Sequence, residues 1–496
     1  MEAGLPADPM QPAGAGAIAQ RLRKPQGTAR AQTGIVHLGL GAFFRAHGAL
    51  YIEEAMKASG GDWGITGVSL MRPDQRDALA PQDFAYTAVE LGPEGETPRL
   101  VTVLNGVLVA RENPEAVLKA LCDPKVKIVS LTVTEKGYCH APATGRLNRD
   151  HADIRHDLSH PGSPVSAIGF LVWALERRRA AGHRPFTVLC CDNLPENGKV
   201  VGGVVREFAE TVSPDLARWI EAECSFPSTM VDRIVPATKP EDIEKLVPLI
   251  GALDLSPVMH EPFRQWVVED RFVDGLRPDF GAVGVELVEN VTPYEHMKLR
   301  CLNGTHSALA YLGYLAGKET IAETVADPAL HRYCRRLWDE EITPGLKAPP
   351  GVSLADYTAA LMTRYCNPAI RHRTWQIAMD GSQKLPQRIL GTIAENLAAG
   401  RPISGLALAV AAWMRYVGGV DEKGNAIDVR DPLATRLKEL SDAGVTAHDK
   451  VKNLLSVREI FPEALAGNAV LQDLLVRHYQ SLQDKGALNT IKDLPS

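Results

Sequence analysis

The sequence lacks the features that mark secreted, membrane-spanning and metal-cluster proteins. Its 496 residues include eight cysteines, but no two of them form a CxxC pair and most lie in apolar runs. We therefore interpret them as reduced core thiols of a cytoplasmic protein. No apolar run approaches the roughly 18 residues of a membrane-spanning helix, and no basic N-terminal region precedes an apolar one. These absences predict neither a transmembrane segment nor a secretory signal.

A strong net charge is also missing. Lys and Arg total 54 against 60 Asp and Glu, which gives a formal net charge of −6. Nucleic-acid and anionic-membrane partners usually require a basic excess, so we expect neither. The composition, 45% hydrophobic and 23% charged, is typical of a soluble globular chain whose length allows two or three domains. A small charged ligand would have to be bound by local charges.

The first recognisable unit is a short apolar run, a glycine-rich turn and a helical pattern. The run covers residues 34–38, the turn reads G-L-G-A-F-F-R at 39–45, and the helical pattern continues to about residue 59. In dinucleotide-binding folds such glycines let the backbone approach the pyrophosphate, and the helix N-terminus offers unpaired N–H groups. Phe44 stands where the usual fingerprint has its third glycine, so the motif alone is a weak indication.

Further buried runs alternate with helical patterns along the first half of the chain. The runs cover 64–70, 127–134 and 186–191, and the helical patterns cover 114–122, 166–181 and 199–211. This alternation predicts an α/β fold with a mostly parallel, doubly wound, Rossmann-like sheet. Ligands bind such sheets at the carboxyl ends of the strands, where Thr134, Glu135 and Asn193 follow the later runs.

From about residue 285 the strand-like runs nearly vanish. Helical patterns dominate to the end, at 294–316, 328–341, 353–365, 386–399, 404–417, 431–442 and 469–485. We therefore predict three parts. They are a poorly ordered lead-in over 1–30, a Rossmann-like dinucleotide-binding domain over 31–285 and a mainly α-helical substrate and catalytic domain over 286–496.

Four polar side chains share one side of the predicted helix at 294–312. At about 100° per residue, Glu295, Lys298, Asn303 and His306 fall within an arc of about 140°. Oxidation of a secondary alcohol by a nicotinamide needs a base for the hydroxyl proton and donors for the oxygen. A lysine of lowered pKa and side-chain amides, with Asn193 arriving from a strand end, would supply both. On spacing alone, a solvated polar face remains the simpler explanation.

Several blocks in order identify a family resemblance. The spacing Lys298-x4-Asn303-x2-His306 resembles the catalytic signature of the polyol-specific long-chain dehydrogenase/reductase (mannitol dehydrogenase) family. The resemblance covers nearly the whole chain from about residue 34. It includes G-L-G-A-F-F-R-A-H at 39–47, S-L-T-V-T-E-K-G-Y at 130–138, C-D-N-L-P-E-N-G at 191–198, T-M-V-D-R-I-V-P at 229–236, E-P-F-R-Q-W-V-V-E-D at 261–270 and D-G-S-Q-K-L-P at 380–386.

The resemblance implies a role for each polar residue of the signature. Lys298 would be the general base in alcohol oxidation and the acid in carbonyl reduction. Asn193 and Asn303 would form the oxyanion-binding pair, and His306 would orient a substrate oxygen. Glu295, one helical turn before the lysine, resembles the family's proton-relay carboxylate. Asp232, in the V-D-R block, would help to shape the substrate pocket.

The resemblance also favours NAD as coenzyme and implies chemistry without metal. NAD enzymes usually place an acidic residue just after the second strand to bind the ribose 2′-hydroxyl. Asp74 is acidic but late, whereas Arg72 could accommodate a 2′-phosphate, so NADP stays an alternative. The predicted coenzyme contacts are Gly39, Gly41, Ala42, Phe43, Arg45, Asp74, Thr134 and Glu135.

One histidine-rich loop offers a rival metal signal. Its members have irregular spacing and no cysteine pair joins them, so a solvated loop explains them better than a zinc site. They are His140, His151, His156 and His160, with Asp150, Asp153 and Asp157.

Three blocks favour a sugar-acid substrate within the family: residues 76–83, 371–388 and 414–429 resemble the fructuronate reductases. Arg371 or Arg373, beside Lys384, could bind a carboxylate in bidentate fashion, although each arginine could equally pair with a surface acid. We therefore predict a cytoplasmic reductase that interconverts D-fructuronate and D-mannonate, as a monomer or weak homo-oligomer. The alternatives are a mannitol 2-dehydrogenase, a related polyol or tagaturonate oxidoreductase, and a non-catalytic dinucleotide-binding sensor.

Overall fold

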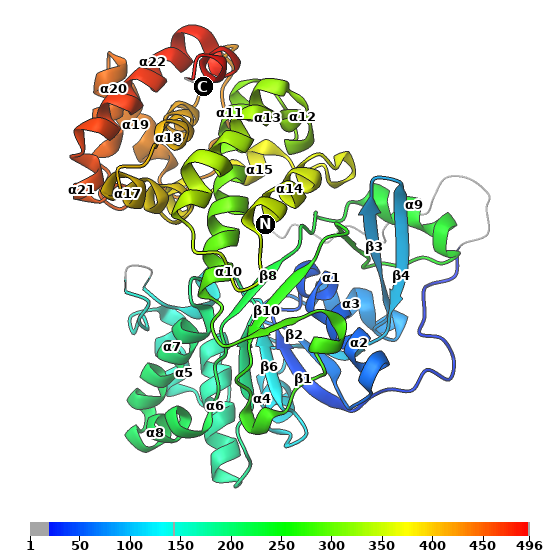
Figure 1. Ribbon diagram of the computed structural model, residues 1–496. Helices are drawn as coiled ribbons and strands as arrows, with labels where there is room; N and C mark the ends of the chain where they lie inside the picture. The colour runs from blue at the N-terminus through cyan, green and yellow to red at the C-terminus, as the bar shows by residue number, and fades with distance from the viewer. Residues whose placement is uncertain (1–18, 142–143, 495–496) are drawn as a thin grey trace, which may run out of the picture.

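The two halves of the chain differ in architecture. The computed structural model describes residues 19–141 and 144–494. Strands with flanking helices occupy the lower part of Figure 1, and the helical part above them is coloured from green through yellow to red. This arrangement confirms the predicted Rossmann-like N-terminal part and helical C-terminal part.

A five-stranded parallel sheet forms the centre of the N-terminal part. Its order is β5-β2-β1-β6-β7, and every neighbouring pair is parallel. Parallel strands end at one edge of the sheet on their carboxyl side, so the segments that follow β1, β6 and β7 come close together. The strands are β1 (Thr33–Leu38), β2 (Gly64–Ser69), β5 (Leu104–Val109), β6 (Ile128–Leu131) and β7 (Thr187–Cys190).

Both faces of this sheet are covered, because successive side chains of a strand point to opposite faces. Val36 and Leu38 of β1 share a core with α4 (Pro114–Cys122), α6 (Ala167–Ala180) and α7 (Asn197–Val212). Ile35 faces the other core, with α1 (Ala42–Ala46) and α2 (Gly48–Ser59). Strands buried on both faces read as continuous apolar runs, which is why the sequence predicted them.

Two smaller sheets complete this part and were not predicted. In one, β3 pairs with β4 and β9, and in the other, β10 pairs with β8 and β11. Pro98 lies in β4, which is an edge strand, the usual place for a proline in a sheet. The strands are β3 (Tyr86–Gly92), β4 (Gly95–Val101), β9 (Val258–His260), β8 (Thr229–Asp232), β10 (Gln265–Glu269) and β11 (Glu286–Val288). β11 lies just beyond the predicted domain boundary at 285.

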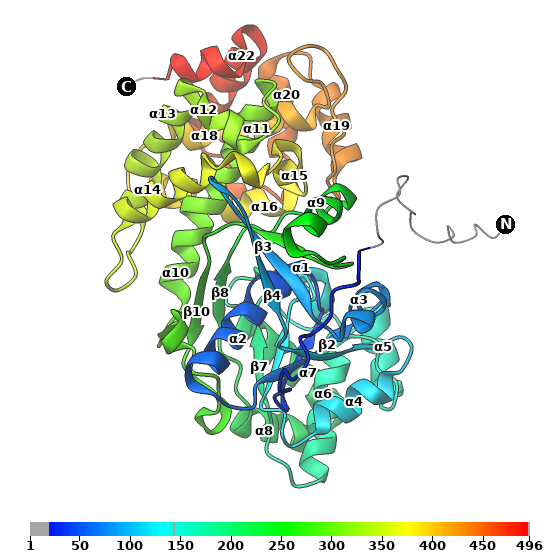
Figure 2. The ribbon, with the colours of Figure 1, turned by 90° about the vertical axis from the view of Figure 1, so that its right-hand side faces the viewer.

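The helical part packs around α18 (Ser404–Val417). Its alanine-rich sequence S-G-L-A-L-A-V-A-A-W-M-R-Y-V is buried along most of its length and lets α11 and α22 approach closely (Figure 2). The other helices here are α10 (Thr292–Met297), α11 (Thr305–Leu315), α12 (Ile321–Ala326), α13 (Pro328–Arg336), α14 (Leu354–Tyr365), α15 (Thr374–Ala378), α16 (Gly381–Leu385), α17 (Gly391–Ala398), α19 (Ala434–Asp442), α20 (Ala447–Leu455), α21 (Glu463–Ala466) and α22 (Ala469–Lys492).

Several helical runs contain π-helical segments. They are η5 (Lys298–Gly304), η6 (Leu337–Ile342) and η9 (Pro386–Leu390), and η5 packs directly against η9. Such segments add a residue to a turn and are frequent at functional sites. Lys298 and Asn303 both belong to η5, so this local geometry determines where they point.

The expected lead-in divides into two stretches. Residues 1–18 lie outside the described residues, whereas Gln20 and Leu22 exchange backbone hydrogen bonds with Leu253. The short helices α3 (Asp74–Leu79), α5 (Ala152–Ser159), α8 (Pro214–Glu223) and α9 (Pro240–Ile250) complete the N-terminal part. Across both described ranges, no helix is long and apolar enough to cross a bilayer.

Candidate active site

Lys298 is the buried centre of the site. Its side-chain Nζ donates hydrogen bonds to Asn193 Oδ1 at 2.6 Å and to the Val231 carbonyl at 2.7 Å. Asn193 follows β7, Val231 belongs to β8, and Lys298 begins η5 of the helical part. The two parts of the chain therefore meet at this amine.

The environment of Lys298 shifts its titration towards neutrality. Burial lowers the pKa of the amine to about 8, a change that Asp232 opposes and that Arg388 and Arg364 reinforce. A lysine with such a pKa exchanges its proton near physiological pH, which an ordinary surface lysine does not. Lys298 is 7% exposed, and this burial argues against the alternative that it is a solvated surface lysine.

The uniform α-helix predicted over 294–312 is wrong in detail. The π-helical segment η5 interrupts it between α10 and α11, so the predicted spacing of about 100° per residue does not hold there. The four polar residues nevertheless converge. Lys298, Asn303 and His306 line one cavity, while Glu295, Lys298 and Asn303 line a small neighbouring one.

His306 presents an unpaired nitrogen to the site. The ring stacks on Tyr365, with centroids 4.8 Å apart, and meets the His372 ring edge-on at 4.9 Å. Its Nε2 is buried without a hydrogen-bond partner among the described residues. Burial holds the pKa of His306 well below its usual value, so the imidazole is neutral. A neutral ring with one free polar atom can orient a ligand hydroxyl.

Glu295 contacts the sheet domain one helical turn before Lys298. Its carboxylate accepts the Glu196 backbone N–H at 3.0 and 3.2 Å. Burial raises the pKa of Glu295 to about 7, and the bond from Glu196 opposes that change. The carboxyl and the amine of Lys298 therefore have nearly matched proton affinities, which suits proton exchange between them through water.

Asp232 lines the cavity, but its carboxylate is engaged by an arginine that the sequence did not single out. Arg364 of α14 donates to both Asp232 oxygens at 2.7 and 3.1 Å and to both Glu261 oxygens at 2.7 and 3.0 Å. All three side chains are buried. This network joins the helical part to β8 and to the segment after β9, and so supports the wall behind Lys298.

The main cavity has a volume of about 960 Å³ and is rich in cations. Arg371, Arg373 and Lys384, the candidate carboxylate contacts, all line it, and so does Phe43 of the glycine-rich turn. Their surroundings differ. Arg373 pairs with Glu319 at 3.5 Å, Arg371 is exposed, and Lys384 donates to the Met379 carbonyl at 2.6 Å.

Sequence reasoning missed Arg388, which also lines this cavity. It lies in η9, and its guanidinium donates to Ser307 Oγ at 3.1 Å. The arginine stands within the quoted 371–388 block, but it is separated from Lys298 by 90 residues. Only the packing of η9 on η5 brings the two together.

The glycine-rich turn has room for a coenzyme backbone. Gly39 has a φ of +90°, and a Cβ there would lie 2.2 Å from the Thr132 carbonyl oxygen, so glycine is required for the fold itself. A Cβ on Gly41 would meet nothing closer than 3.8 Å, which leaves open space at the start of α1. The turn therefore fits a dinucleotide pyrophosphate approaching Gly41, Ala42 and Phe43.

The other predicted coenzyme contacts lie in different surroundings. Thr134 and Glu135 are exposed beyond the carboxyl end of β6. Asp74 is exposed at the start of α3 and forms an ion pair with Arg72 at 3.1 Å. The two side chains considered for the ribose 2′-position therefore contact each other. Arg45 is buried and donates to the Ser256 carbonyl at 2.6 Å, so its guanidinium faces the protein interior.

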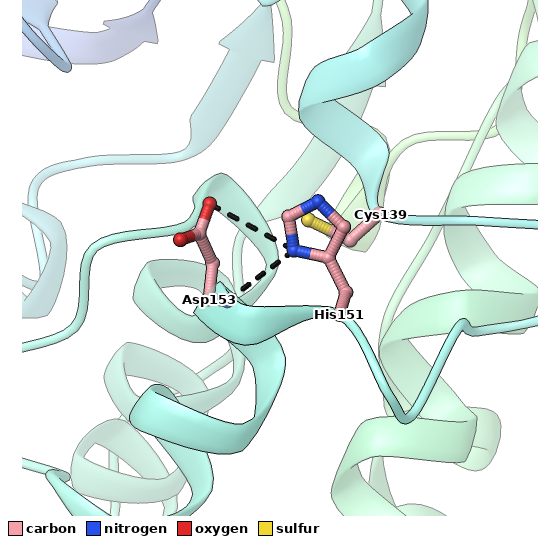
Figure 3. A group of neighbouring side chains, drawn as sticks. All are labelled: Cys139, His151 and Asp153. Carbon is pink, nitrogen blue, oxygen red and sulfur yellow. Dashed lines mark hydrogen bonds and ion pairs between the residues drawn. The ribbon is translucent and has the colours of Figure 1, made fainter.

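The histidine-rich loop forms local caps. Cys139, His151 and Asp153 lie close together, as Figure 3 shows, but His151 Nδ1 accepts the Asp153 backbone N–H at 3.3 Å and caps α5. That bond gives Nδ1 of His151 a structural role at the start of α5. His156 bonds to the buried Asp157, which also accepts three hydrogen bonds from residues 165 and 166. His151, His156 and Asp157 therefore have structural partners, whereas Nδ1 of His140 is buried without one among the described residues.

Comparisons with known proteins cover nearly the whole chain. Residues 33–280 match the model of the mannitol dehydrogenase Rossmann domain, and residues 290–483 match the mannitol dehydrogenase C-terminal domain. The D-mannonate oxidoreductase of Escherichia coli (strain K12) is 46% identical over 94% of this chain and 96% of that protein. An uncharacterized oxidoreductase of the same strain, YdfI, is 48% identical over 92% of this chain and 94% of its own.

A solved structure gives the same fold. It is the Pseudomonas fluorescens mannitol 2-dehydrogenase in ternary complex with NAD and D-mannitol, with a TM-score of 0.85 and 40% sequence identity. The match covers 96% of each chain.

Proposed function

The chain belongs to the mannitol dehydrogenase family, and we propose that it interconverts D-fructuronate and D-mannonate with NAD as coenzyme. The family and the names of its relatives establish the broader class, an NAD-dependent oxidoreductase acting on CH–OH groups. The observation that carries the narrower proposal is the cluster of cations in the cavity that holds Lys298. The 46% identity to a D-mannonate oxidoreductase supports it.

The coenzyme would be held by the turn at Gly39–Phe43, with its nicotinamide directed towards the cavity that Phe43 lines. When bound, NADH supplies a hydride to the substrate carbonyl carbon. The residues of this chain then have two tasks. They must stabilise the oxygen as it gains negative charge, and they must deliver a proton to it.

Lys298 supplies that proton in our proposal. A protonated amine within the cavity can transfer a proton to the carbonyl oxygen during reduction, and the neutral amine can take it back during oxidation. The lowered pKa of Lys298, about 8, keeps both forms accessible near neutral pH. Glu295, with a pKa of about 7, would pass protons between the amine and solvent.

The amides and the imidazole would stabilise and orient the substrate oxygens. Because a lysine amine at neutral pH chiefly donates, the short contact with Lys298 fixes Asn193 with its oxygen towards the amine. The Asn193 NH₂ group is then left to donate to the developing alkoxide, together with Asn303. The unpaired Nε2 of His306 would bond a neighbouring hydroxyl.

A neutral polyol or ketose is the main alternative substrate, since the structural relative named above is a complex with D-mannitol. We favour a sugar acid because Arg371 and Arg388 line the cavity without an acidic partner among the described residues, and a neutral polyol would not supply one. NADH oxidation measured in parallel with D-fructuronate, D-tagaturonate and D-fructose tests the choice. We expect the highest kcat/KM with fructuronate, and faster turnover of fructose would refute the proposal.

A non-catalytic dinucleotide-binding sensor is the alternative from another class. The assembled set of Lys298, Asn193 and His306 argues against it, because a sensor has no need of a buried lysine with a lowered pKa. Saturable NADH binding without turnover of any ketose or uronate would favour the sensor. A cytoplasmic location and a monomeric or weakly oligomeric state stay predictions.

A further inference from the structure

Arg388 lines the cavity with most of its guanidinium donors unsatisfied among the described residues. Among the described residues, Arg388 has no carboxylate in ion-pair distance, and its guanidinium makes one side-chain hydrogen bond, to Ser307 Oγ. Guanidinium carries five N–H donors and stays charged in proteins. A partly buried cation with most donors unsatisfied is unfavourable unless a ligand completes it.

The neighbouring arginines differ from Arg388 in this respect. Arg364 is saturated by the carboxylates of Asp232 and Glu261, and Arg373 pairs with Glu319. Arg371 is exposed, with its backbone in the left-handed region at a φ of 46°. Arg233 also lines the cavity without an acidic partner, but its guanidinium donates to the backbone carbonyls of Glu261 and Ala46. Arg388 therefore combines partial burial, a place in the cavity wall and a guanidinium with most of its donors unused.

Its position next to the reacting groups is fixed by packing. Arg388 lies in η9, which packs against η5, the segment that carries Lys298 and Asn303. It is bonded to Ser307, the residue after His306, and His306 lines the same cavity. Burial is the main cause of the lowered pKa values of Lys298, Lys384, His306 and His372, and the positive charge of Arg388 lowers all four further. An anion bound at Arg388 would therefore lie in the same cavity as Lys298.

We propose that Arg388 binds the carboxylate of the substrate and thereby selects a sugar acid over a neutral sugar. Lys384, on the preceding helical turn, adds a second positive charge on the same side. The planar fork of the guanidinium can hold both carboxylate oxygens, which an ammonium cannot do. This inference rests on the proposed function and replaces Arg371 and Arg373 as the primary carboxylate contact.

The test compares an anionic and a neutral ligand in the same variants. In Arg388→Met the unbranched stem is kept but the charged guanidinium is lost, and we expect kcat/KM for D-fructuronate to fall on the order of 30-fold or more. The fall should come mainly from KM, whereas the value for D-fructose should change less than about threefold. Arg388→Lys retains the charge without the fork and should give an intermediate, equally selective loss.

A binding measurement separates this inference from the proposed function. The enzyme–NADH complex cannot react with D-mannonate or D-mannitol, so calorimetry gives their Kd values directly. Arg388→Met should raise the Kd of mannonate on the order of 30-fold and leave that of mannitol nearly unchanged. If the wild-type enzyme prefers fructose, the proposed function fails, and these Kd values still decide the role of Arg388.

Three outcomes would overturn the inference. Equal losses for mannonate and mannitol would make Arg388 a general packing residue, and unchanged Kd values for both would leave it no role in binding. A selective loss in Arg373→Met but not in Arg388→Met would assign the carboxylate to Arg373. Arg436→Met, on exposed α19 and paired with Glu459, is the matched control for removing an arginine. Should Arg388→Met fail to fold, the selectivity of Arg388→Lys decides.

Discussion

Lys298 donates a 2.6 Å hydrogen bond to Asn193, although 105 residues separate them in the sequence. One residue begins a π-helical segment of the helical part, and the other follows the last strand of the parallel sheet. The proton-transfer group and the oxyanion donor therefore come from different parts of the chain. The site is therefore complete only when the two parts pack together.

The direction of catalysis should determine the pH profile. Reduction uses protonated Lys298, so its kcat/KM should be constant at low pH and fall as pH rises through about 8. Oxidation uses the neutral amine, so its kcat/KM should rise through the same pH. Initial rates in both directions between pH 5.5 and about 10 would show these profiles. Two profiles of the same sign would contradict the assignment.

Replacement of Glu295 should change that profile in a defined way. The anionic carboxylate favours the protonated form of Lys298, so Glu295→Gln should move the lysine inflection to lower pH. Glu289→Gln, at an exposed acid between β11 and α10, is the control. A Glu295→Gln profile that superimposes on the wild-type profile would remove Glu295 from the relay.

Two glycines of the turn should respond differently to alanine. Gly41→Ala places a Cβ in open space, so folding stability should hold while the Kd for NADH rises. Gly39→Ala places a Cβ against the Thr132 carbonyl at a positive φ, so the protein should lose stability outright. Thermal unfolding and NADH fluorescence titration measure the two effects. Unchanged NADH affinity in Gly41→Ala would place the pyrophosphate elsewhere.

The buried network at Arg364 should be important for stability. Arg364→Leu leaves the carboxylates of Asp232 and Glu261 buried without their partner, and we expect a loss of about 3–5 kcal/mol in unfolding free energy. Arg436→Leu removes a pair that is about half exposed and should cost less than about 1 kcal/mol. Urea denaturation of both variants tests the contrast. Similar losses of unfolding free energy in the two variants would show that the Arg364 network stabilises the protein no more than a surface ion pair does.

The sequence predicted the elements whose signals are local. The apolar runs at β1, β6 and β7 are continuous because both faces of the sheet are covered, and the spacing of Lys298 and Asn303 indicated a polar cluster. The π-helical geometry at 298–304 was not predicted, because a pattern analysed at a constant 100° per residue cannot reveal an inserted residue. The edge strand β4 was missed because it is largely exposed and contains Pro98.

The missed site residues share one cause. Arg364 acts on Asp232 across 132 positions, and Arg388 reaches the cavity only because η9 packs on η5. Nothing near either arginine in the sequence distinguishes it from the many that pair on the surface. Their burial and the identity of their partners are properties of the packed structure, which sequence spacing does not contain.

The most direct test of the account is the chemistry of Lys298→Ala with NADH and D-fructuronate. Removing the proton donor should lower kcat by about 10²–10⁴-fold while the Kd for NADH stays within about twofold of the wild-type value. Lys438→Ala, at an exposed pair on α19, should behave as the wild type. Turnover of Lys298→Ala at a rate near that of the wild type would contradict the central claim that this amine moves the proton.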